Sequence, residues 1–374
     1  MSARTAGTDR PDRPVLRIAG SGPRELGLDR GRQARAGIAR AWSVYEKLFE
    51  TVAAQRGRTV DVRAHAERTV EATRAWAPEL VEEMAGVAEG AGIPFWTVAA
   101  LNARTEILAE AGAPRTGECS TLVRTGPGAG RFAGGQCWDW HEELADAWHV
   151  QTVAGGPHAF AGITEHGILA KIGVNDAGVG VLFNILGHDA DGAAGVPVHL
   201  VARRVLGAAG SFAEAVGMIA GAPVSASTVL TVVTADRAAS VELSPAGTAV
   251  VEPDEGGWLV RTNHFLAPAL AAGELRGRRE PETYDRWRLL GGRVAGRGGP
   301  DTREELAALL TAHAADGAEV CCHAPADGAL GTRWATLATV ALDPAGRRTA
   351  VHAGGPCTAG AADAWTEVSV PGGE

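Results

Sequence analysis

Apolar residues along the first part of the chain recur at three- and four-residue spacing, which is typical of amphipathic helices. The pattern predicts one helix from Arg24 to about Ala54. Glu79–Ala91 and Phe95–Ala109 show similar spacing, and Pro78 and Pro94 suit the first turn of each. The chain therefore opens with a mainly helical region.

Short runs rich in Val, Leu, Ile and Thr begin at Cys119 and predict strands. The predicted strands are Thr121–Arg124, Phe132–Trp140, Val150–Val153, Ile168–Val174, Val179–Asn184, Thr228–Thr234, Ser240–Leu243, Val250–Val251, Leu259–Arg261, Thr336–Leu342 and Thr349–His352, with Val15–Ile18 earlier. Helices are predicted at Val198–Leu206, Phe212–Ile219, Tyr284–Leu290 and Glu304–His313. Helices and strands occur in blocks, which favours an α+β fold over a parallel βαβ sheet. No long linker divides residues 1–374, so one domain is expected.

Composition and charge narrow the class of partner. The 374 residues carry a formal net charge of -9 without a Lys/Arg cluster, which argues against nucleic acid or an anionic membrane and favours small molecules. The first twenty residues lack an apolar segment that could act as a secretory signal. The 5 cysteines do not form a disulfide-like framework. A cytoplasmic protein with reduced thiols is therefore expected.

Cys119 is the candidate nucleophile. It stands where the helical region gives way to strands, within Glu118-Cys119-Ser120-Thr121. A cut between Glu118 and Cys119 would leave an α-amine with a pKa of about 8, able to act as a base beside its own thiol. The structural alternative is that Cys119 is simply a buried residue of a strand.

Two further residues suit the same chemistry. Asn263 could donate a hydrogen bond from its amide to an oxyanion without releasing a proton. Asp139 could orient the new α-ammonium group, with which it is charge-matched. The structural alternatives are that Asn263 closes a turn and that Asp139 accepts from backbone donors.

We expect no metal and no cofactor. His141–Ala145 lacks the second histidine of a zinc-protease helix, and Cys321-Cys322-His323 is too compact to present three tetrahedral ligands. Gly126–Gly130 resembles a hairpin loop, since a phosphate cradle would carry a Lys and a following helix.

Several ordered motifs resemble the isopenicillin N acyltransferase family of N-terminal-nucleophile enzymes. They are Asn102–Glu106, Glu118–Thr121, Gly135–Trp140, Gly167–Val181 with Asn184, Thr262–His264, and Thr336-Leu337 followed by Asp343. The resemblance covers most of the chain. It implies a four-layer αββα sandwich, self-cleavage before Cys119 into associated chains 1–118 and 119–374, and acyl transfer or hydrolysis through an acyl-Cys119.

By position within these motifs, the resemblance also assigns functional roles to Asp139 and Asn263. The implied substrates are a small N-acyl amide, or an acyl thioester such as acyl-coenzyme A together with an amine, and the implied setting is biosynthetic, secondary metabolism. Hydrolysis and transfer both stay open. A different class also stays open: an uncleaved, inactive relative that binds a small molecule or a partner protein.

The chain departs from the family pattern at two positions. Cys137 stands where the family often has Asn, and Cys322 where it often has a functional Arg, so clamping of a penicillin-like carboxylate is in doubt. We hypothesise that Cys137 and Cys322 line one pocket, with Trp138 and His323 as further candidates. The alternatives are that both cysteines fill space and that His323 is structural.

Overall fold

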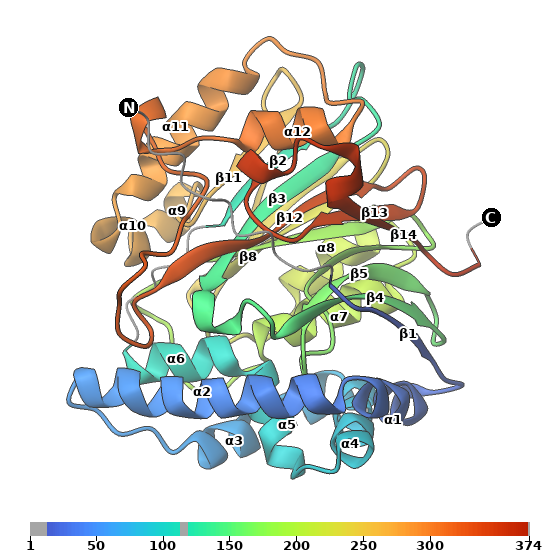
Figure 1. Cartoon of the computed structure of the whole chain (residues 1–374), viewed down its shortest axis with the longest axis vertical. Coiled ribbons are helices and arrows are strands. Elements are labelled where there is room, and N and C mark those ends of the chain that lie inside the picture. Colours follow the sequence, from blue (N-terminus) through green and yellow to red (C-terminus); the bar gives the residue numbers. More distant parts are fainter. Residues whose placement is uncertain (1–12, 113–118, 373–374) are drawn as a thin grey trace.

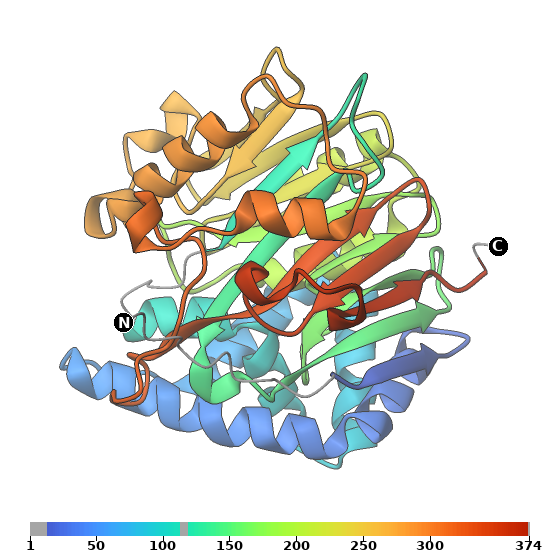
Figure 2. The same cartoon turned by 45° about the horizontal axis from the view of Figure 1, so that its top comes forward.

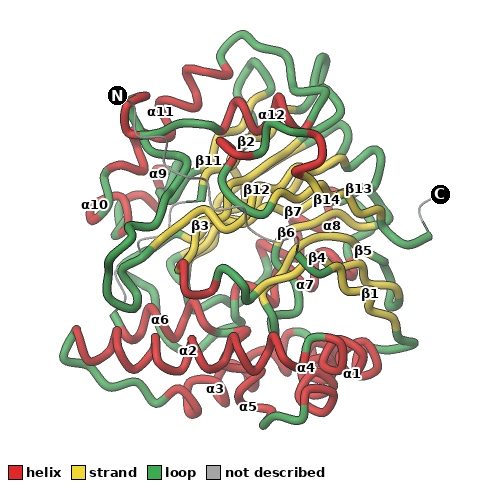
Figure 3. The backbone as a smooth tube through the Cα atoms, viewed as in Figure 1, coloured by secondary structure: helices red, strands yellow, loops and turns green. Residues whose placement is uncertain are grey.

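The computed structural model describes residues 13–112 and 119–372 as two packed β-sheets with helices on both outer faces (Figures 1 and 3). Glu118, one side of the proposed cut, lies outside the described residues. Among the residues described, no helix combines the length and apolar character that a bilayer crossing needs.

The first layer of helices gathers at one end of the molecule (Figure 1). It consists of α1 (Pro23–Gln33), α2 (Arg35–Gln55), α3 (Val62–Trp76), α4 (Pro78–Ala91), α5 (Phe95–Asn102) and α6 (Arg104–Ala111). Helices α1 and α4 pack closely because glycines replace side chains at their contact. A Cβ on Gly27 would lie 2.0 Å from the Glu83 carbonyl oxygen, and one on Gly86 2.1 Å from that of Arg24.

Eight strands form the first sheet, in the order β1-β4-β5-β6-β7-β8-β9-β10. They are β1 (Val15–Ala19), β4 (Trp148–Ala154), β5 (Phe160–Glu165), β6 (Ile172–Asn175), β7 (Gly180–Ile185), β8 (Thr228–Val233), β9 (Ala238–Ser244) and β10 (Gly247–Val251). Only the pair β1 and β4 is parallel among the described pairs of this sheet. Helices α7 (Val198–Ala208) and α8 (Phe212–Ala220) cover its outer face.

Six strands form the second sheet, in the order β11-β2-β3-β12-β13-β14. They are β11 (Trp258–Arg261), β2 (Ser120–Arg124), β3 (Gly134–His141), β12 (Trp334–Asp343), β13 (Arg348–His352) and β14 (Trp365–Ser369). Its outer face carries α11 (Glu282–Val294) and α12 (Arg303–Leu310), preceded by the short α9 (Pro268–Ala271) and α10 (Arg276–Arg279) (Figure 2).

The two sheets face each other through contacts of β2 and β3 with β7, and of β12 and β13 with β6. Gln136 on β3 adds a polar link, because its side chain accepts from the Phe183 N–H of β7 at 2.8 Å and donates to the Phe183 carbonyl. The order is helices, sheet, sheet, helices. The predicted α+β class and four-layer αββα sandwich are confirmed.

Several predicted elements have different limits. The single helix expected over Arg24–Ala54 breaks at Ala34, and Phe95–Ala109 breaks at Ala103, so each is two helices. Pro94 is the N-cap of α5 and not in its first turn. The strand expected over Ile168–Val174 begins only at Ile172, and the helix expected to reach His313 ends at Leu310. The apolar residues in these segments extend beyond the limits of the helix or strand itself.

A buried ionic network joins the first helical layer to the first sheet. Arg104 of α6 and Lys171 both contact Glu165 of β5, at 2.5 Å and 2.9 Å. Tyr45 of α2 donates a hydrogen bond to the same carboxylate. Burial alone would raise the pKa of Glu165, but the Arg104 and Lys171 cations hold it below its usual range.

Replacing Glu165 with Gln should destabilise the fold, because the two buried cations then lose their counter-charge. We expect a loss of about 3–5 kcal/mol in the free energy of unfolding near neutral pH, measured by denaturant titration. Since the Glu165 pKa is depressed by folding, its contribution is complete above its unfolded pKa of about 4.3 and is lost as the pH falls. The difference in the free energy of unfolding between wild type and variant should therefore become smaller as the pH falls.

The control is Glu67→Gln, which removes an exposed carboxylate paired with Arg63 at 2.9 Å. That change should alter stability by less than about 1 kcal/mol. Equal stability of Glu165→Gln and wild type would show that the network contributes nothing.

Candidate functional site around Cys119

Cys119 directly precedes β2, a strand flanked by β11 and β3 in the second sheet. The residue is 5% exposed. Its carbonyl oxygen accepts a hydrogen bond from Asn184 Nδ2 at 3.0 Å and one from Arg286 Nη1 at 3.2 Å. Asn184 belongs to β7 of the facing sheet and Arg286 to α11. The backbone at the candidate nucleophile is thus held from two layers.

Arg286 is the functional residue that the sequence analysis missed. Its fully buried guanidinium also donates to Ser120 Oγ at 2.9 Å and to Asn263 Oδ1 at 3.2 Å. The side chain points inward because it shares the buried face of α11 with Leu290 and Val294. The sequence does contain a signal for this residue: a charged side chain stands among the apolar residues on the buried face of a predicted helix.

Asn263 lies next to this guanidinium. Its backbone N–H donates to Thr283 Oγ1 at 2.9 Å, and its Nδ2 donates to the Ile185 carbonyl at 2.9 Å. These bonds and the Arg286 contact fix the orientation of the amide. Asn184, beside Ile185, is fixed similarly because its Oδ1 accepts from Thr121 Oγ1 at 2.8 Å. Two oriented carboxamides therefore flank the start of β2.

Asp139 on β3 contacts Cys119 directly. The side chain is 2% exposed, and its residue lies opposite Thr336 of β12. Burial raises the pKa of the Cys119 thiol, and the Asp139 carboxylate raises it further. The Lys171 ammonium and a hydrogen bond from the Asp139 backbone act in the opposite direction. In the intact chain this thiol is therefore mostly protonated at neutral pH.

Lys171 places a positive charge behind the candidate nucleophile. Its ammonium lies 4.1 Å from the centre of the Trp138 ring, and burial lowers the pKa of Lys171 to about 8. Trp138 also packs edge-on against Trp148, with ring centres 5.9 Å apart. Trp138 is thus part of the interior between the sheets.

The predicted pocket residues lie on two sides of the second sheet. Successive strand residues face opposite sides, so Cys137 faces α12, where it packs with Leu306, while Trp138 faces the other sheet. Cys322 donates a hydrogen bond from its thiol to the Trp334 carbonyl at 3.3 Å, and His323 is exposed. The structure does not gather these four residues around one cavity among those described below.

A cavity of about 810 Å³ has Arg276 in its lining. Its lining includes Gly187, His188, Ala193, Leu275 and charged residues of both signs, namely Arg56, Arg58, Glu110, Asp189, Asp191, Arg276, Arg279 and Glu280. Arg276 connects it with the site, because this cation lowers the pKa of Cys119. A space of this size suits a small molecule.

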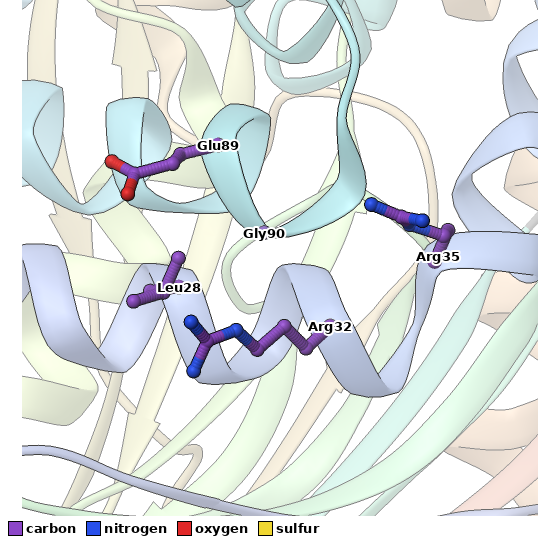
Figure 4. Close-up of a pocket in the computed structure, with 5 residues that line it drawn as sticks. All are labelled: Leu28, Arg32, Arg35, Glu89 and Gly90. Atoms are coloured by element: carbon purple, nitrogen blue, oxygen red, sulfur yellow. The ribbon is translucent and has the colours of Figure 1, made fainter.

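A separate hollow of about 530 Å³ lies between α1 and α4 (Figure 4). Leu28, Arg32, Arg35, Glu89 and Gly90 line it. It lies in the first helical layer, and none of the predicted catalytic residues contributes to its lining.

Replacing Asp139 with Asn should lower the pKa of Cys119, because it removes a nearby negative charge that opposes thiolate formation. We expect iodoacetamide to alkylate Cys119 roughly two- to tenfold faster at pH 8 in the chains that are still uncleaved, which are identified by a peptide spanning positions 118 and 119. Peptide mass spectrometry measures the rate, with Cys357 in the same sample as an internal control. An unchanged or slower rate would show that the Asp139 charge does not act on the thiol.

Two sequence comparisons show which known proteins the chain resembles. Residues 127–291 match the family model described as acyl-coenzyme A:6-aminopenicillanic acid acyl-transferase. Over 341 residues, the chain is 28% identical to the acyl-coenzyme A:6-aminopenicillanic-acid-acyltransferase 40 kDa form of Emericella nidulans, covering 89% of this chain and 91% of the relative.

Two solved structures show weaker likeness. The Caenorhabditis elegans N-acylethanolamine-hydrolyzing acid amidase ortholog is 13% identical, with a TM-score of 0.43 over 68% of this chain and 100% of its own. Penicillin V acylase from Agrobacterium tumefaciens is 12% identical, with a TM-score of 0.38 over 63% of this chain and 75% of its own. The family model and the Emericella relative confirm the resemblance drawn from the motifs: the chain is similar to acyl-coenzyme A:6-aminopenicillanic acid acyltransferases.

Proposed function

We propose that the protein is a self-cleaving enzyme that hydrolyses or transfers an acyl group at an amide bond through an acyl-Cys119 intermediate. The observation that carries the proposal is the setting of Cys119. Its carbonyl is held by Asn184 and Arg286, and Asp139 lies against its thiol. A cysteine that only filled the core would not require buried polar groups on every side.

Self-cleavage would begin with attack of the Cys119 thiol on the Glu118 carbonyl. The C–N bond breaks as the C–S bond forms, and the thiol proton passes to the departing nitrogen, giving a thioester and an α-amine. Water then hydrolyses the thioester, which restores the thiol and leaves a carboxylate on Glu118. The pKa of Cys119, raised by burial, limits the thiolate population in this step.

After cleavage, the free α-amine would take the proton from the Cys119 thiol as the sulfur attacks the substrate carbonyl. Asn263 is the proposed donor to the resulting oxyanion, and losing such a donor typically lowers the rate by about 10²–10³-fold. Asp139 would orient the α-ammonium group, which then protonates the leaving amine or thiol. Water or a second amine finally takes the acyl group.

The processed chains 1–118 and 119–374 would remain associated as one domain, because buried polar contacts cross the cut. Arg104 of the first chain binds Glu165 of the second at 2.5 Å, and Trp140 donates to the Tyr45 hydroxyl at 2.7 Å. Val198 N–H donates to Glu106 at 2.9 Å. Separating the chains would leave these groups unpaired at an apolar surface.

The cavity lined by Arg276 is the proposed substrate site, and its arginines could bind an anionic group of the substrate. Arg276 and Arg279 lie in its wall, and guanidinium groups bind carboxylates and phosphates well. The Emericella relative is named for acyl-coenzyme A, a phosphate-bearing thioester, and for 6-aminopenicillanic acid. An acyl thioester such as acyl-coenzyme A is the proposed donor and an amine the acceptor, in biosynthetic metabolism in the cytoplasm.

Purified wild-type protein should separate into two fragments on denaturing electrophoresis, whereas Cys119→Ala should remain one chain. The alanine variant lacks the sulfur that attacks the Glu118 carbonyl. N-terminal sequencing of the second wild-type fragment should begin at Cys119.

The matched control is Cys322→Ser, which removes a thiol bonded to the Trp334 carbonyl and should be cleaved like wild type. An intact wild-type chain would overturn self-cleavage and favour the alternative of an inactive binding protein. Cleavage of Cys119→Ala at the same position would point to a contaminating protease.

Incubating the processed protein with an acyl thioester should add the acyl mass to Cys119, as measured by intact-mass spectrometry of the second fragment. Adding an amine should then release the acyl group as a new amide if the enzyme is a transferase. Release of free acid alone, at a rate independent of the amine, would identify a hydrolase. A fragment that never gains the acyl mass from thioesters or amides would contradict the covalent mechanism.

A further inference from the structure

Three side chains that could bind a metal ion converge beside the second sheet, and none of them is a proposed catalytic residue. His313 follows α12, His323 follows the Cys321-Cys322 pair, and Cys357 lies in the short helix η3 (Pro356–Thr358). The candidate ligand atoms of these three residues all lie within 4.8 Å of one another. Residues from three separate segments thus present nitrogen and sulfur atoms to one point.

Cys321 extends the cluster. Its buried thiol is hydrogen-bonded to the thiol of Cys357. Cys357 also contacts both imidazoles, those of His313 and His323. Two cysteines and two histidines are the ligand set of many structural zinc sites.

The separations match tetrahedral coordination. Bonds of about 2.3 Å from zinc to sulfur and about 2.0 Å to nitrogen place a sulfur and a nitrogen about 3.5 Å apart, and two nitrogens about 3.3 Å apart. Cys357 Sγ lies 3.6 Å from His323 Nε2, and His313 Nε2 lies 3.2 Å from His323 Nε2. One ion could therefore contact all three atoms with little movement of the side chains.

We propose that His313, His323 and Cys357, with Cys321 as the fourth ligand, form a structural Zn²⁺ site. The sequence analysis expects no metal because Cys321-Cys322-His323 alone is too compact. The fold removes that objection, because His313 and Cys357 come from other segments and Cys322 is turned to the Trp334 carbonyl. This proposal does not depend on the proposed function.

The ion would fix the loops that support the far side of the catalytic strands. Cys322, between two of the ligands, exchanges hydrogen bonds with Thr336: its N–H donates to Thr336 Oγ1 at 3.0 Å, and its carbonyl accepts from Thr336 N–H at 2.9 Å. Thr336 lies opposite Asp139 in the sheet. Four protein ligands leave no open position for a substrate, so the role is structural.

The test uses full-length protein that has been reduced and stripped with a chelator. We expect it to bind one equivalent of Zn²⁺ per chain in competition with a chromophoric chelator. Co²⁺ should give the visible absorption bands of a tetrahedral site with thiolate ligands. Cys357→Ser and His323→Ala should each weaken Zn²⁺ binding by about 100-fold or more.

The matched control is Cys322→Ser, which removes the thiol adjacent to the site and should bind Zn²⁺ within about twofold of wild type. Since His323 is exposed, His323→Ala should keep the fold, which circular dichroism checks. Absence of stoichiometric binding by the reduced wild type overturns the proposal. So does equal affinity in Cys357→Ser, or exclusive formation of a Cys321–Cys357 disulfide that persists in reductant.

Discussion

A single buried guanidinium holds together the parts from which the candidate catalytic centre is built. Arg286 binds the Cys119 carbonyl, the Ser120 hydroxyl and the Asn263 amide, and so connects α11, β2 and the segment after β11. Removing a cation from water costs several kcal/mol, and only well-placed acceptors offset it. The acceptors therefore cannot move independently, and the start of β2 stays in one position.

The same logic applies on the opposite side of Cys119. Lys171 is stabilised as a cation by Glu165 and by the face of Trp138, and it acts on the Cys119 thiol through space. Arg104 reaches the same carboxylate from the helical layer that precedes the proposed cut. The charge behind the nucleophile thus depends on contacts between the two halves of the chain, which links the association of processed fragments to reactivity.

Most helices and strands can be predicted from the sequence because their apolar residues recur at regular spacing. The prediction fails for elements that lack this regular spacing. Helix α3 escaped prediction because His65, Thr69 and Thr73 lie on its buried face in place of apolar residues. Strand β5 escaped because Gly162 and Thr164 interrupt its apolar run. Buried polar positions are set by partners distant in sequence, and a local pattern does not contain them.

The candidate site shows the same division. Cys119, Asp139 and Asn263 come from ordered motifs; Asp139 lies beside Cys119, and Arg286 binds both Asn263 and the Cys119 carbonyl. Arg286 has no such motif, since its role exists only when α11 packs on β2. Conversely, Cys137 and Trp138 are neighbours in the chain but face opposite sides of the strand. Adjacency in sequence therefore misplaces pocket residues that strand alternation separates.

Two cysteines in different surroundings have different proposed roles, one as a nucleophile and one as a metal ligand. Cys119 is buried beside a carboxylate, so its thiol is favoured until a base is created next to it. Cys357 is only partly buried and lies among a thiol and two imidazoles, so its thiolate is favoured. Both proposed uses need the thiolate, since it is the form that attacks a carbonyl and the form that binds a metal ion. Placing the two on different sides of the second sheet keeps a soft metal ion away from the reactive sulfur.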